Sequence, residues 1–361
     1  MSTMRAMVLT GHGDMDKLVW HTDWPKPEAG PGEVLIRVGA CGLNNTDVNT
    51  RSGWYSKAVT EATTGSAYDS VAAEDPSWGG RPLAFPRIQG ADVAGRVEAV
   101  GDGVDPGLVG KRVMVEVWLR DPAAPDDMNR TGYYGSEIDG GFAEYTKAPA
   151  ANVHPIECDL TDAELATFAT SYVTAENMLN RAAVKAGDSV LITGASGGVG
   201  SALIQLARRR GARAIAMAGE DKWDQLSTFS PDAILPRSPD DLAAALQEAT
   251  GRREVSVVAD VVGGSLWPQL IGVIERGGRY TCSGAIAGPI VAFDLRTFYL
   301  RDLVFTGATV VPKGTFADLV GYIARGEIKP ILAETYPLEK LHDAQRAFIA
   351  KKHVGNIVVV P

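Results

Sequence analysis

The segment 194–200, which reads GASGGVG, has the residue types that most clearly indicate chemistry. It lies between an apolar run typical of a strand and the helix-like run SALIQLA. Its glycines leave room for a pyrophosphate, for a tight turn and for close packing of a helix on a strand, and the free amides at the start of the helix attract phosphate groups. The same letters also match G-x-S-x-G, a turn that presents a nucleophilic serine, here Ser196.

The residues downstream of this turn favour the phosphate interpretation. A hydrolase of the nucleophile-elbow class needs an acid and then a histidine after its serine, and only His342 and His353 follow, both in or beside a terminal amphipathic segment. No lysine followed by serine or threonine comes after the glycines, so the turn is not an ATP-binding P-loop. We therefore expect a dinucleotide site and keep a serine hydrolase using Ser196 as an alternative.

Two regions of different composition must position these residues. Residues 1–153 are rich in glycine, proline and β-branched residues and predict a mainly β domain, with strands at 5–9, 33–39, 95–100 and 112–116. Beyond residue 160 strands and helices alternate, which predicts a parallel sheet covered on both faces. The expected strands are 189–193, 214–218, 255–262 and 278–282, and the expected helices are 200–210, 239–248 and 266–275. The closing part of the chain predicts helices at 316–325 and 338–351 and a strand at 356–360.

The composition narrows the class of protein. The 361 residues have a net charge of −9, which fits a globular protein of two domains and argues against nucleic-acid binding, because neutralising phosphates needs basic clusters. The three cysteines, at 41, 158 and 282, form no C-x-x-C and predict neither a disulfide framework nor a thiolate zinc site. Neither a signal-peptide core nor a membrane span is evident, so we expect a cytoplasmic protein with no membrane partner.

Six ordered motifs carry a family resemblance. They read CGLNNTDVNTRSGWY (41–55), GADVAGRVEAVG (90–101), GGFAEY (140–145), GASGGVGSALIQLA (194–207), VVADVVGG (257–264) and HVGNIVVVP (353–361). In them the chain resembles the medium-chain dehydrogenase/reductase superfamily over nearly its whole length, and most of all the zinc-independent quinone oxidoreductase (zeta-crystallin-like) branch. The resemblance implies an α/β plus β fold, with a GroES-like, mainly β catalytic domain at 1–155 and 311–361 and a Rossmann cofactor-binding domain at 156–310.

The resemblance also locates the positions where zinc-dependent relatives hold their catalytic metal. Those positions fall on Asn44, Ala91 and Thr170, and none of them supplies the thiolate, imidazole or carboxylate that zinc needs. Cys41 lies three positions before the first of them and is expected to be an ordinary strand cysteine. We therefore predict an enzyme without a metal.

The predicted lack of a metal narrows the reaction. Alcohol oxidation in this fold relies on a Lewis acid to stabilise the alkoxide, whereas hydride delivery to a conjugated acceptor does not. A quinone or an α,β-unsaturated carbonyl (enoyl) compound is therefore the expected acceptor. The resemblance places Asn44, Asp47 and Tyr55 near that acceptor, with Asn44 and Tyr55 as hydrogen-bond or proton donors, and aligns Thr46 with a hydroxyl that relays protons in zinc relatives. Structural roles stay open, with Asp47 as a turn acceptor and Tyr55 as a packing residue.

The cofactor-binding residues follow from the turn and from the resemblance. They are Thr174, Ala195, Ser196, Gly197, Gly198, Val199 and Gly200. NAD-specific relatives carry an acid at the end of the second Rossmann strand to hold the ribose hydroxyls, and Gly219 stands there, although Glu220 follows it directly. Lys222 and Arg237 follow the second and third strands, where relatives bind a 2′-phosphate. We therefore expect NADP(H).

Three further expectations concern the whole molecule. The alternative to an enzyme is a protein that binds the dinucleotide with little turnover, as a sensor or a structural protein. The apolar segment 304–311 reads as the open edge strand of the Rossmann sheet and, with the resemblance, predicts a homodimer. The loop 56–85 is poor in large apolar residues and predicts a lid beside the acceptor site, anchored by Trp54 and Trp78.

Overall fold

The computed structural model describes residues 2–68 and 82–361, and the chain forms two compact units. Unit 1 comprises Met1–Val59, Thr64–Thr170 and Pro312–Pro361 as far as these are described, and unit 2 comprises Thr60–Thr63 and Ser171–Val311. Residues 156–170 thus group with unit 1, whereas the sequence placed them in the cofactor-binding domain. The reason is helix α2 (Asp162–Leu165), which packs on strand β3 (Glu33–Gly42) so closely that a Cβ at Gly39 would collide with the Asp162 carboxylate.

Unit 1 is built on a sheet that, over the described residues, has seven strands in the order β16-β17-β3-β4-β5-β9, with β8 paired to β3. Its strands are β3, β4 (Asp92–Val100), β5 (Arg112–Val115), β8 (Tyr145–Pro149), β9 (Val153–Pro155), β16 (Leu332–Pro337) and β17 (Asn356–Val360). Neighbouring strands are antiparallel except for the parallel pair β16 and β17. The end of the chain therefore returns to pair with β3, as the resemblance implied.

Two small hairpin sheets complete the β part of unit 1. They pair β1 (Thr3–Leu9) with β2 (Leu18–Pro25), and β6 (Trp118–Arg120) with β7 (Thr131–Tyr133). The unit 1 core includes Met7, Ile36, Tyr134 and Phe142, which come from separate elements and are almost fully buried. Cys41 is buried in β3, as predicted for a strand cysteine. Burial of these apolar groups is the main force that holds the polar segments described below in place.

The helices of unit 1 are short. They are α1 (Asn45–Ser52), α2, α9 (Thr315–Ala324) and α10 (Leu341–Ala350), with the one-turn helices η1 (Met15–Lys17), η2 (Pro106–Leu108), η3 (Met128–Arg130), η4 (Ala150–Asn152) and η7 (Leu338–Lys340). The sequence did not predict α1, because its residues are polar yet almost all buried and have no amphipathic period. The helix begins where the Asp47 carboxylate accepts a hydrogen bond from the backbone N–H of Asn44 (2.8 Å), and it ends at Gly53, whose φ of 81° suits glycine.

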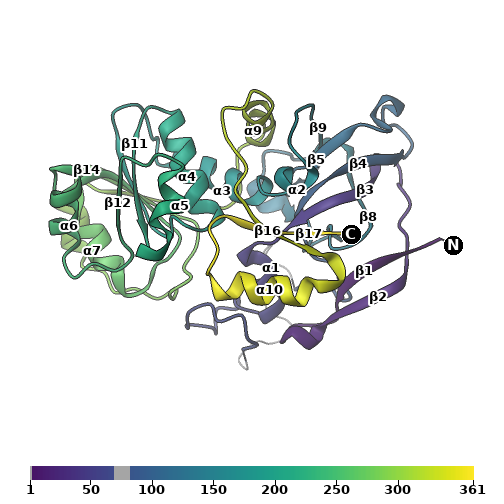
Figure 1. The fold of residues 1–361 in the computed structure, drawn as a ribbon, viewed down its shortest axis with the longest axis horizontal. Coiled ribbons are helices and arrows are strands. Elements are labelled where there is room, and N and C mark those ends of the chain that lie inside the picture. Colours follow the sequence, from purple (N-terminus) through teal and green to yellow (C-terminus); the bar gives the residue numbers. More distant parts are fainter. Residues whose placement is uncertain (1, 69–81) are drawn as a thin grey trace. The chain divides into compact units, whose positions relative to one another are not determined.

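Unit 2 is a Rossmann-type unit whose described strands form one parallel sheet in the order β12-β11-β10-β13-β14-β15. The strands are β10 (Ser189–Ile192), β11 (Arg213–Ala218), β12 (Ala233–Pro236), β13 (Val255–Asp260), β14 (Ile274–Cys282) and β15 (Val304–Gly307). The helices are α3 (Ala169–Arg181), α4 (Gly198–Arg209), α5 (Trp223–Ser227), α6 (Leu242–Thr250), α7 (Trp267–Gly272) and α8 (Leu295–Tyr299), with η5 (Glu220–Lys222) and η6 (Gly264–Leu266). Figure 1 shows α4 and α5 on one side of this sheet and α6 and α7 on the other.

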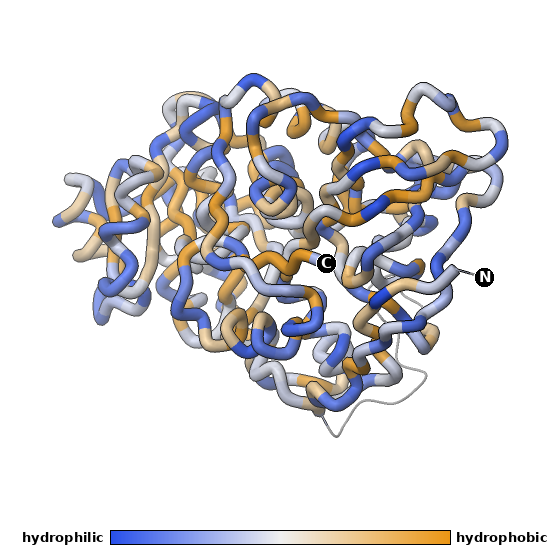
Figure 2. Tube along the Cα trace, turned by 45° about the vertical axis from the view of Figure 1, so that its right-hand side comes forward, coloured by the Kyte–Doolittle hydropathy of each residue, from blue (hydrophilic) through white to orange (hydrophobic). Residues whose placement is uncertain are grey.

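The interior of unit 2 follows from the apolar runs of its strands. Hydrophobic residues concentrate along these strands (Figure 2), and Leu191, Ile215 and Val258 are almost fully buried. The strand order changes direction between β10 and β13, and the edge beyond the carboxyl ends at such a point is where ligands bind in open α/β sheets. The glycine turn follows β10 and therefore lies at this edge.

Two predicted elements of unit 2 are shorter than expected. The helix expected at 266–275 ends at Gly272, because Ile274 pairs with Val255 and starts β14. The edge strand expected at 304–311 is observed only as β15. Tertiary pairing, which a sequence period does not contain, sets both limits.

The long loop predicted at 56–85 is described only at its two ends, because 69–81, including Trp78, lies outside the described residues. Near its start the backbone N–H of Thr63 donates to the carbonyl oxygen of Ile286 (2.9 Å) within unit 2. The lid function of this loop stays a prediction. Over the described residues, no helix has the length and apolarity needed to cross a bilayer.

Candidate active site

A group of buried and half-buried polar side chains lies in unit 1 around α1. We call it the α1 cluster, and its members are Asn44, Thr46, Asp47, Asn49, Tyr55, Asp92, Tyr133 and Thr170. β3 leads into Asn44 and α1, β4 begins at Asp92, β7 ends at Tyr133, and α3 begins beside Thr170. The four predicted catalytic residues of α1 and its flanks are thus together in one place, joined by three residues from distant parts of the chain. Their catalytic role stays a prediction.

Asp47 and Asp92 are two carboxyl groups inside this cluster, and neither makes an ion pair with a described residue. Burial raises the pKa of Asp47 to about 7 and the pKa of Asp92 to about 6, and the charge of Asp92 raises the pKa of Asp47 further. Hydrogen bonds to the ionised forms, from the Asn44 backbone to Asp47 and from Thr170 to Asp92, oppose the rise. The pair therefore holds a proton at a pH where ordinary carboxyls are ionised.

A chain of hydrogen bonds leads to Asp92 from Tyr133 at the end of β7 and from Thr170 at the start of α3. The Thr170 hydroxyl donates to Asp92 Oδ1, and the Thr170 backbone N–H donates to the same oxygen (2.9 Å). Because the single hydroxyl hydrogen of Thr170 is used in that bond, the Tyr133 hydroxyl is the donor in its 2.7 Å hydrogen bond to Thr170 Oγ1. One oxygen of Asp92 thus receives two donors.

Several polar atoms of the cluster have no hydrogen-bond partner among the described residues. They are Asn44 Nδ2, Asn49 Oδ1, Asp92 Oδ2 and, next to the cluster, Gln89 Oε1. All four atoms are buried, and an unsatisfied buried polar group costs on the order of 1–3 kcal/mol. Such a concentration is typical of a place where a ligand supplies the missing partners.

Tyr55 lies just after α1 and faces back into the cluster. Burial raises its pKa above the ordinary tyrosine value, and hydrogen bonds with Thr46 and Asn49 limit that rise. Its ring meets Trp54 edge to face, with 5.6 Å between the ring centroids. Tyr55 therefore has both a polar contact within the cluster and an aromatic packing contact, so its packing role remains open beside the catalytic one.

The sequence analysis did not single out Tyr133 or Arg51. Tyr133 lies far from the α1 motif in sequence and carries no local signal. Arg51 is fully buried at the end of α1 and makes no ion pair with a described residue. Its guanidinium donates to the carbonyl oxygens of Gly13 (2.7 Å) and Gly65 (2.8 Å) and to Gln345 Oε1 of α10 (3.2 Å), so it anchors α1.

The three positions aligned with zinc ligands carry an amide, a methyl group and a hydroxyl. Asn44 and Thr170 are both in the α1 cluster, where the Thr170 hydroxyl donates a hydrogen bond to Asp92. Ala91, which directly precedes Asp92 in the sequence, is buried. No group of three histidines, cysteines or acids that could hold a metal occurs among residues 2–68 and 82–361. Amide, methyl and hydroxyl groups do not replace the thiolate and imidazole ligands of such a site.

The glycine turn between β10 and α4 has the geometry that a pyrophosphate requires. A Cβ at Gly200 would lie 2.2 Å from the carbonyl oxygen of Gly194, so only glycine lets the helix pack on the turn. At Gly197 the nearest atom to an added Cβ is 3.5 Å away, which leaves the approach to the backbone open. No side chain caps α4, so the N–H groups of its first turn are available to a phosphate. Nicotinamide dinucleotides fit this cradle.

Three predicted cofactor residues gather at the carboxyl edge of the unit 2 sheet. β12, β11 and β10 are neighbours, and Arg237, Lys222 and Ser196 follow them in that order. Lys222 Nζ donates to Ser196 Oγ (3.4 Å), and both burial and the charge of Arg237 lower the pKa of Lys222. Gly219 directly follows β11, and Thr174 lies within α3. The two cations therefore share one small region next to the phosphate turn.

Ser196 does not have the surroundings of a hydrolase nucleophile. Its described side-chain contact is with Lys222. In unit 1, His342 Nε2 lies 3.1 Å and 3.0 Å from the carbonyl oxygens of Met15 and Leu18, and the ring of His353 packs on Phe348. Nothing in these contacts supports a serine–histidine pair.

Comparisons with known proteins agree with the two units. The family "Alcohol dehydrogenase GroES-like domain" matches residues 30–158, and the family "Zinc-binding dehydrogenase" matches residues 198–325. The human protein "Quinone oxidoreductase" is 26% identical over 96% of this chain and 94% of its own length. The "Acryloyl-coenzyme A reductase" of Sulfurisphaera tokodaii is 26% identical over 99% of this chain and 100% of its own. A solved structure from Sinorhizobium meliloti 1021, assigned provisionally as an alcohol dehydrogenase, has a TM-score of 0.91 and 47% identity over 100% of this chain and 97% of its own.

The GroES-like and Rossmann-type units, with the bare phosphate turn, define an oxidoreductase that uses a nicotinamide cofactor. The chain belongs to the medium-chain dehydrogenase/reductase superfamily, in its quinone oxidoreductase branch.

Proposed function

We propose that this protein is a metal-free, NADPH-dependent reductase of quinones or α,β-unsaturated carbonyl compounds. The observation that carries the proposal is the α1 cluster, where the positions of zinc ligands are taken by Asn44 and Thr170, and where the pKa values of two buried carboxyl groups are raised to about 7 and about 6, so that the pair holds a proton near neutral pH. The names of the quinone oxidoreductase and acryloyl-coenzyme A reductase relatives point to the same two acceptor classes.

The residues of the cluster suit an acceptor whose conjugation already activates it. The nicotinamide supplies the hydride. Asn44 Nδ2, which has no partner among the described residues, donates a hydrogen bond to the carbonyl oxygen on which negative charge develops. Burial of the cluster excludes water and strengthens this bond.

The preference for NADPH is proposed from Lys222 and Arg237. Each cation can form a charge-assisted hydrogen bond with a 2′-phosphate, and Ser196 Oγ lies beside Lys222 as a third donor. Gly219 supplies no carboxylate to repel that phosphate.

The direct test is steady-state oxidation of NADPH and NADH with 1,4-benzoquinone and 3-buten-2-one as acceptors. We expect turnover with NADPH, no loss of activity after treatment with a chelator, and less than one zinc per ten chains by elemental analysis. One zinc per chain removed together with activity would refute the metal-free mechanism. Tight NADPH binding without oxidation by any acceptor would support the alternative of a sensor or structural protein.

We also propose a homodimer in the cytoplasm. Within the described residues, Ile290, Leu295, Tyr299, Leu300 and Val304 are exposed apolar side chains of one segment of unit 2 that ends in the edge strand β15. A second copy that pairs with β15 across a two-fold axis would cover both the open edge and these side chains. Light scattering tests this. We expect twice the chain mass for the unmodified protein and a lower mass for Leu300→Lys, which places a charge in the proposed interface.

A further inference from the structure

The two oxygens of the Asp92 carboxyl group have different surroundings. Oδ1 accepts hydrogen bonds from the backbone N–H and the hydroxyl of Thr170, whereas Oδ2 is buried and has no partner among the described residues. A proton on Asp92 therefore resides on Oδ2, because Oδ1 is occupied by donors. The side-chain amide of Asn44 lies near this carboxyl group and favours its ionised form, which lowers its pKa, although Asn44 Nδ2 completes no hydrogen bond with a described residue.

We propose that Asp92 is a catalytic acid of this protein, which donates the proton on Oδ2 to the reduced acceptor while Asn44 Nδ2 binds the acceptor's oxygen. Thr170 and Tyr133 are positioning residues, since they act through Oδ1 by deciding which oxygen carries the proton. This inference rests on the proposed reductase function. It assigns a role to a residue that the sequence analysis did not single out.

The chemistry balances with the reductant already proposed. Hydride from the nicotinamide adds to the β-carbon of an α,β-unsaturated carbonyl compound, and the electron pair of the C=C bond moves to form an enolate. The O–H bond of Asp92 breaks, its proton bonds to the enolate oxygen, and the resulting enol tautomerises to the saturated carbonyl product. Asp92 is left as a carboxylate and regains a proton from water.

The surroundings of Asp92 keep its proton available near neutral pH. Burial is the largest cause of its raised pKa, and the titratable groups that face it are Asp47 of α1, Cys41 of β3 and Tyr133 of β7. All of these are acids, so none stabilises a carboxylate as a cation would. The hydrogen bonds from Thr170 and the side chain of Asn44 oppose this rise and leave the pKa of Asp92 at about 6, a value at which the proton transfers readily.

Kinetics of four variants test the proposal, with NADPH and 3-buten-2-one as substrates. Asp92→Asn keeps the shape and the acceptor oxygen of the side chain but removes the acid. We therefore expect kcat to fall about 100-fold or more, and the alkaline limb of the pH profile, where kcat decreases as pH rises, to disappear. Thr170→Val and Tyr133→Phe should move that limb, Thr170→Val toward higher pH because a bond to the ionised form is lost. Tyr134→Phe is the matched control, since Tyr134 is a buried tyrosine that directly follows Tyr133 but has its hydroxyl hydrogen-bonded to Thr146 and Lys147 instead. It should keep the pH profile of the unmodified protein.

A second measurement does not depend on turnover. Infrared difference spectra of the free protein should show a carboxyl group that titrates near pH 6 and is absent in Asp92→Asn. If Asp92 is ionised down to pH 4, or if Asp92→Asn keeps the kcat and pH profile of the unmodified protein, the inference is wrong even though the reductase function stands. If none of the acceptors supports oxidation of NADPH by the unmodified protein, the proposed function is wrong, and the catalytic role of Asp92 is wrong with it.

Discussion

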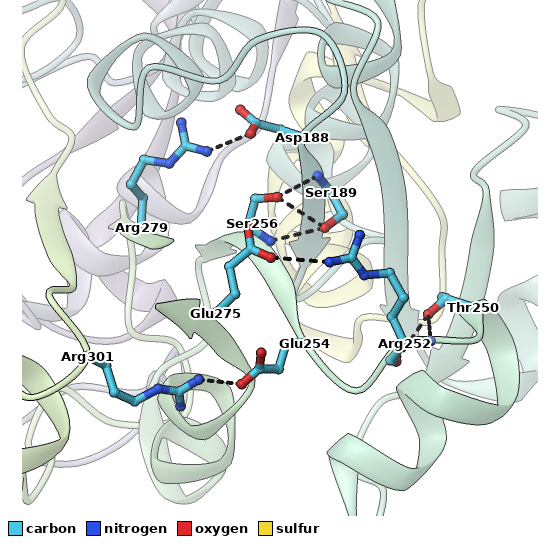
Figure 3. A network of polar contacts seen from close by, with 9 residues as sticks. All are labelled: Asp188, Ser189, Thr250, Arg252, Glu254, Ser256, Glu275, Arg279 and Arg301. Carbon is cyan, nitrogen blue, oxygen red and sulfur yellow. Dashed lines mark hydrogen bonds and ion pairs between the residues drawn. The ribbon is translucent and has the colours of Figure 1, made fainter. Parts of the chain in front are cut away.

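The α1 cluster of unit 1 and the polar network of unit 2 in Figure 3 differ in how fully their polar groups are paired. In the network, Arg279 pairs with Asp188 (2.7 Å), Arg301 with Glu254 (2.6 Å) and Arg252 with Glu275 (3.4 Å). Ser189 and Ser256 exchange hydrogen bonds between β10 and β13. These groups lie near the amino ends of the strands, away from the glycine turn. In the α1 cluster, by contrast, two carboxyl groups pair with no cation and several atoms have no hydrogen-bond partner within residues 2–68 and 82–361.

The same contrast holds for single residues. Asp260 of β13 is fully buried like Asp92, yet it accepts hydrogen bonds from Thr193 Oγ1 (2.6 Å), from Tyr280 OH (2.8 Å) and from the backbone of the following loop. Both oxygens of Asp260 accept hydrogen bonds, whereas Oδ2 of Asp92 accepts none from the part of the chain that the structure describes. Satisfied networks secure a fold, while unsatisfied buried groups are retained where a ligand or a proton must be handled.

The largest expected effect is at Gly200 of the glycine turn, where a side chain cannot be accommodated. Gly200→Val places a side chain 2.2 Å from a backbone oxygen, so we expect loss of NADPH binding and a loss of stability of about 4 kcal/mol or more. Gly197→Ala is the control, because its Cβ meets only an ordinary 3.5 Å contact and the fold should persist. Isothermal titration and thermal unfolding measure both. An unchanged melting temperature in Gly200→Val would contradict the packing role.

The next effect concerns the pH dependence of stability. Burial raises the pKa of Asp47 to about 7 from its unfolded value near 4, so the native state binds the proton more tightly. The unfolding free energy therefore falls as pH rises from about 4 to 7. Relative to that of the unmodified protein, the unfolding free energy of Asp47→Asn should rise by on the order of 3 kcal/mol between pH 4 and pH 8.

Denaturant unfolding followed by tryptophan fluorescence at a series of pH values checks this gain. The control is exposed Asp294, whose pKa is lowered to about 2 by its bonds to Arg296, so its titration ends below this range. Asp294→Asn should show no change in slope from pH 5 to pH 8. A parallel pH dependence of Asp47→Asn and the unmodified protein would mean that Asp47 stays ionised.

A smaller effect is expected in the satisfied network. Arg279 donates to Asp188 and to the carbonyl oxygens of Ala182 and Ala183, and both partners of the ion pair are mostly buried. Arg279→Met should reduce the unfolding free energy by about 2 kcal/mol and leave the NADPH dissociation constant unchanged. Arg276→Met, whose pair with Asp302 is exposed, should cost much less. A change in cofactor affinity without a change in stability would reverse the distinction drawn between the two regions.

The smallest effect is on the choice of nicotinamide. Removing both cations with Lys222→Ala and Arg237→Ala should weaken NADPH binding about tenfold or more and leave NADH binding nearly unchanged, because only NADPH carries the 2′-phosphate. Arg213→Ala is a control, since Arg213 begins β11 at the opposite end of the strand. Titration of the unmodified protein with both cofactors is the baseline, and equal affinities there would count against NADP(H).

Several elements of unit 2 could be predicted because they are determined locally. Apolar runs, glycines and helix periods located β10, α4, β11 and β13 to within a few residues, since hydrophobic burial and turn geometry act over short stretches. α1 could not be predicted, because its polar residues are buried by neighbours distant in sequence. The boundary at 155/156 differed for a related reason, as α2 packs back onto β3.

By itself the sequence determined the superfamily, the phosphate turn and the amino acids at the positions of the zinc ligands, because each depends only on which residues follow one another. Only the tertiary structure decided that Tyr133, Thr170 and Asp92 form one hydrogen-bonded chain, and that Arg51 is a buried anchor. Burial and long-range neighbours control the pKa of a carboxyl group and the satisfaction of its oxygens. Those quantities exist only once the chain has folded, so the acid proposed here has no signature in the sequence.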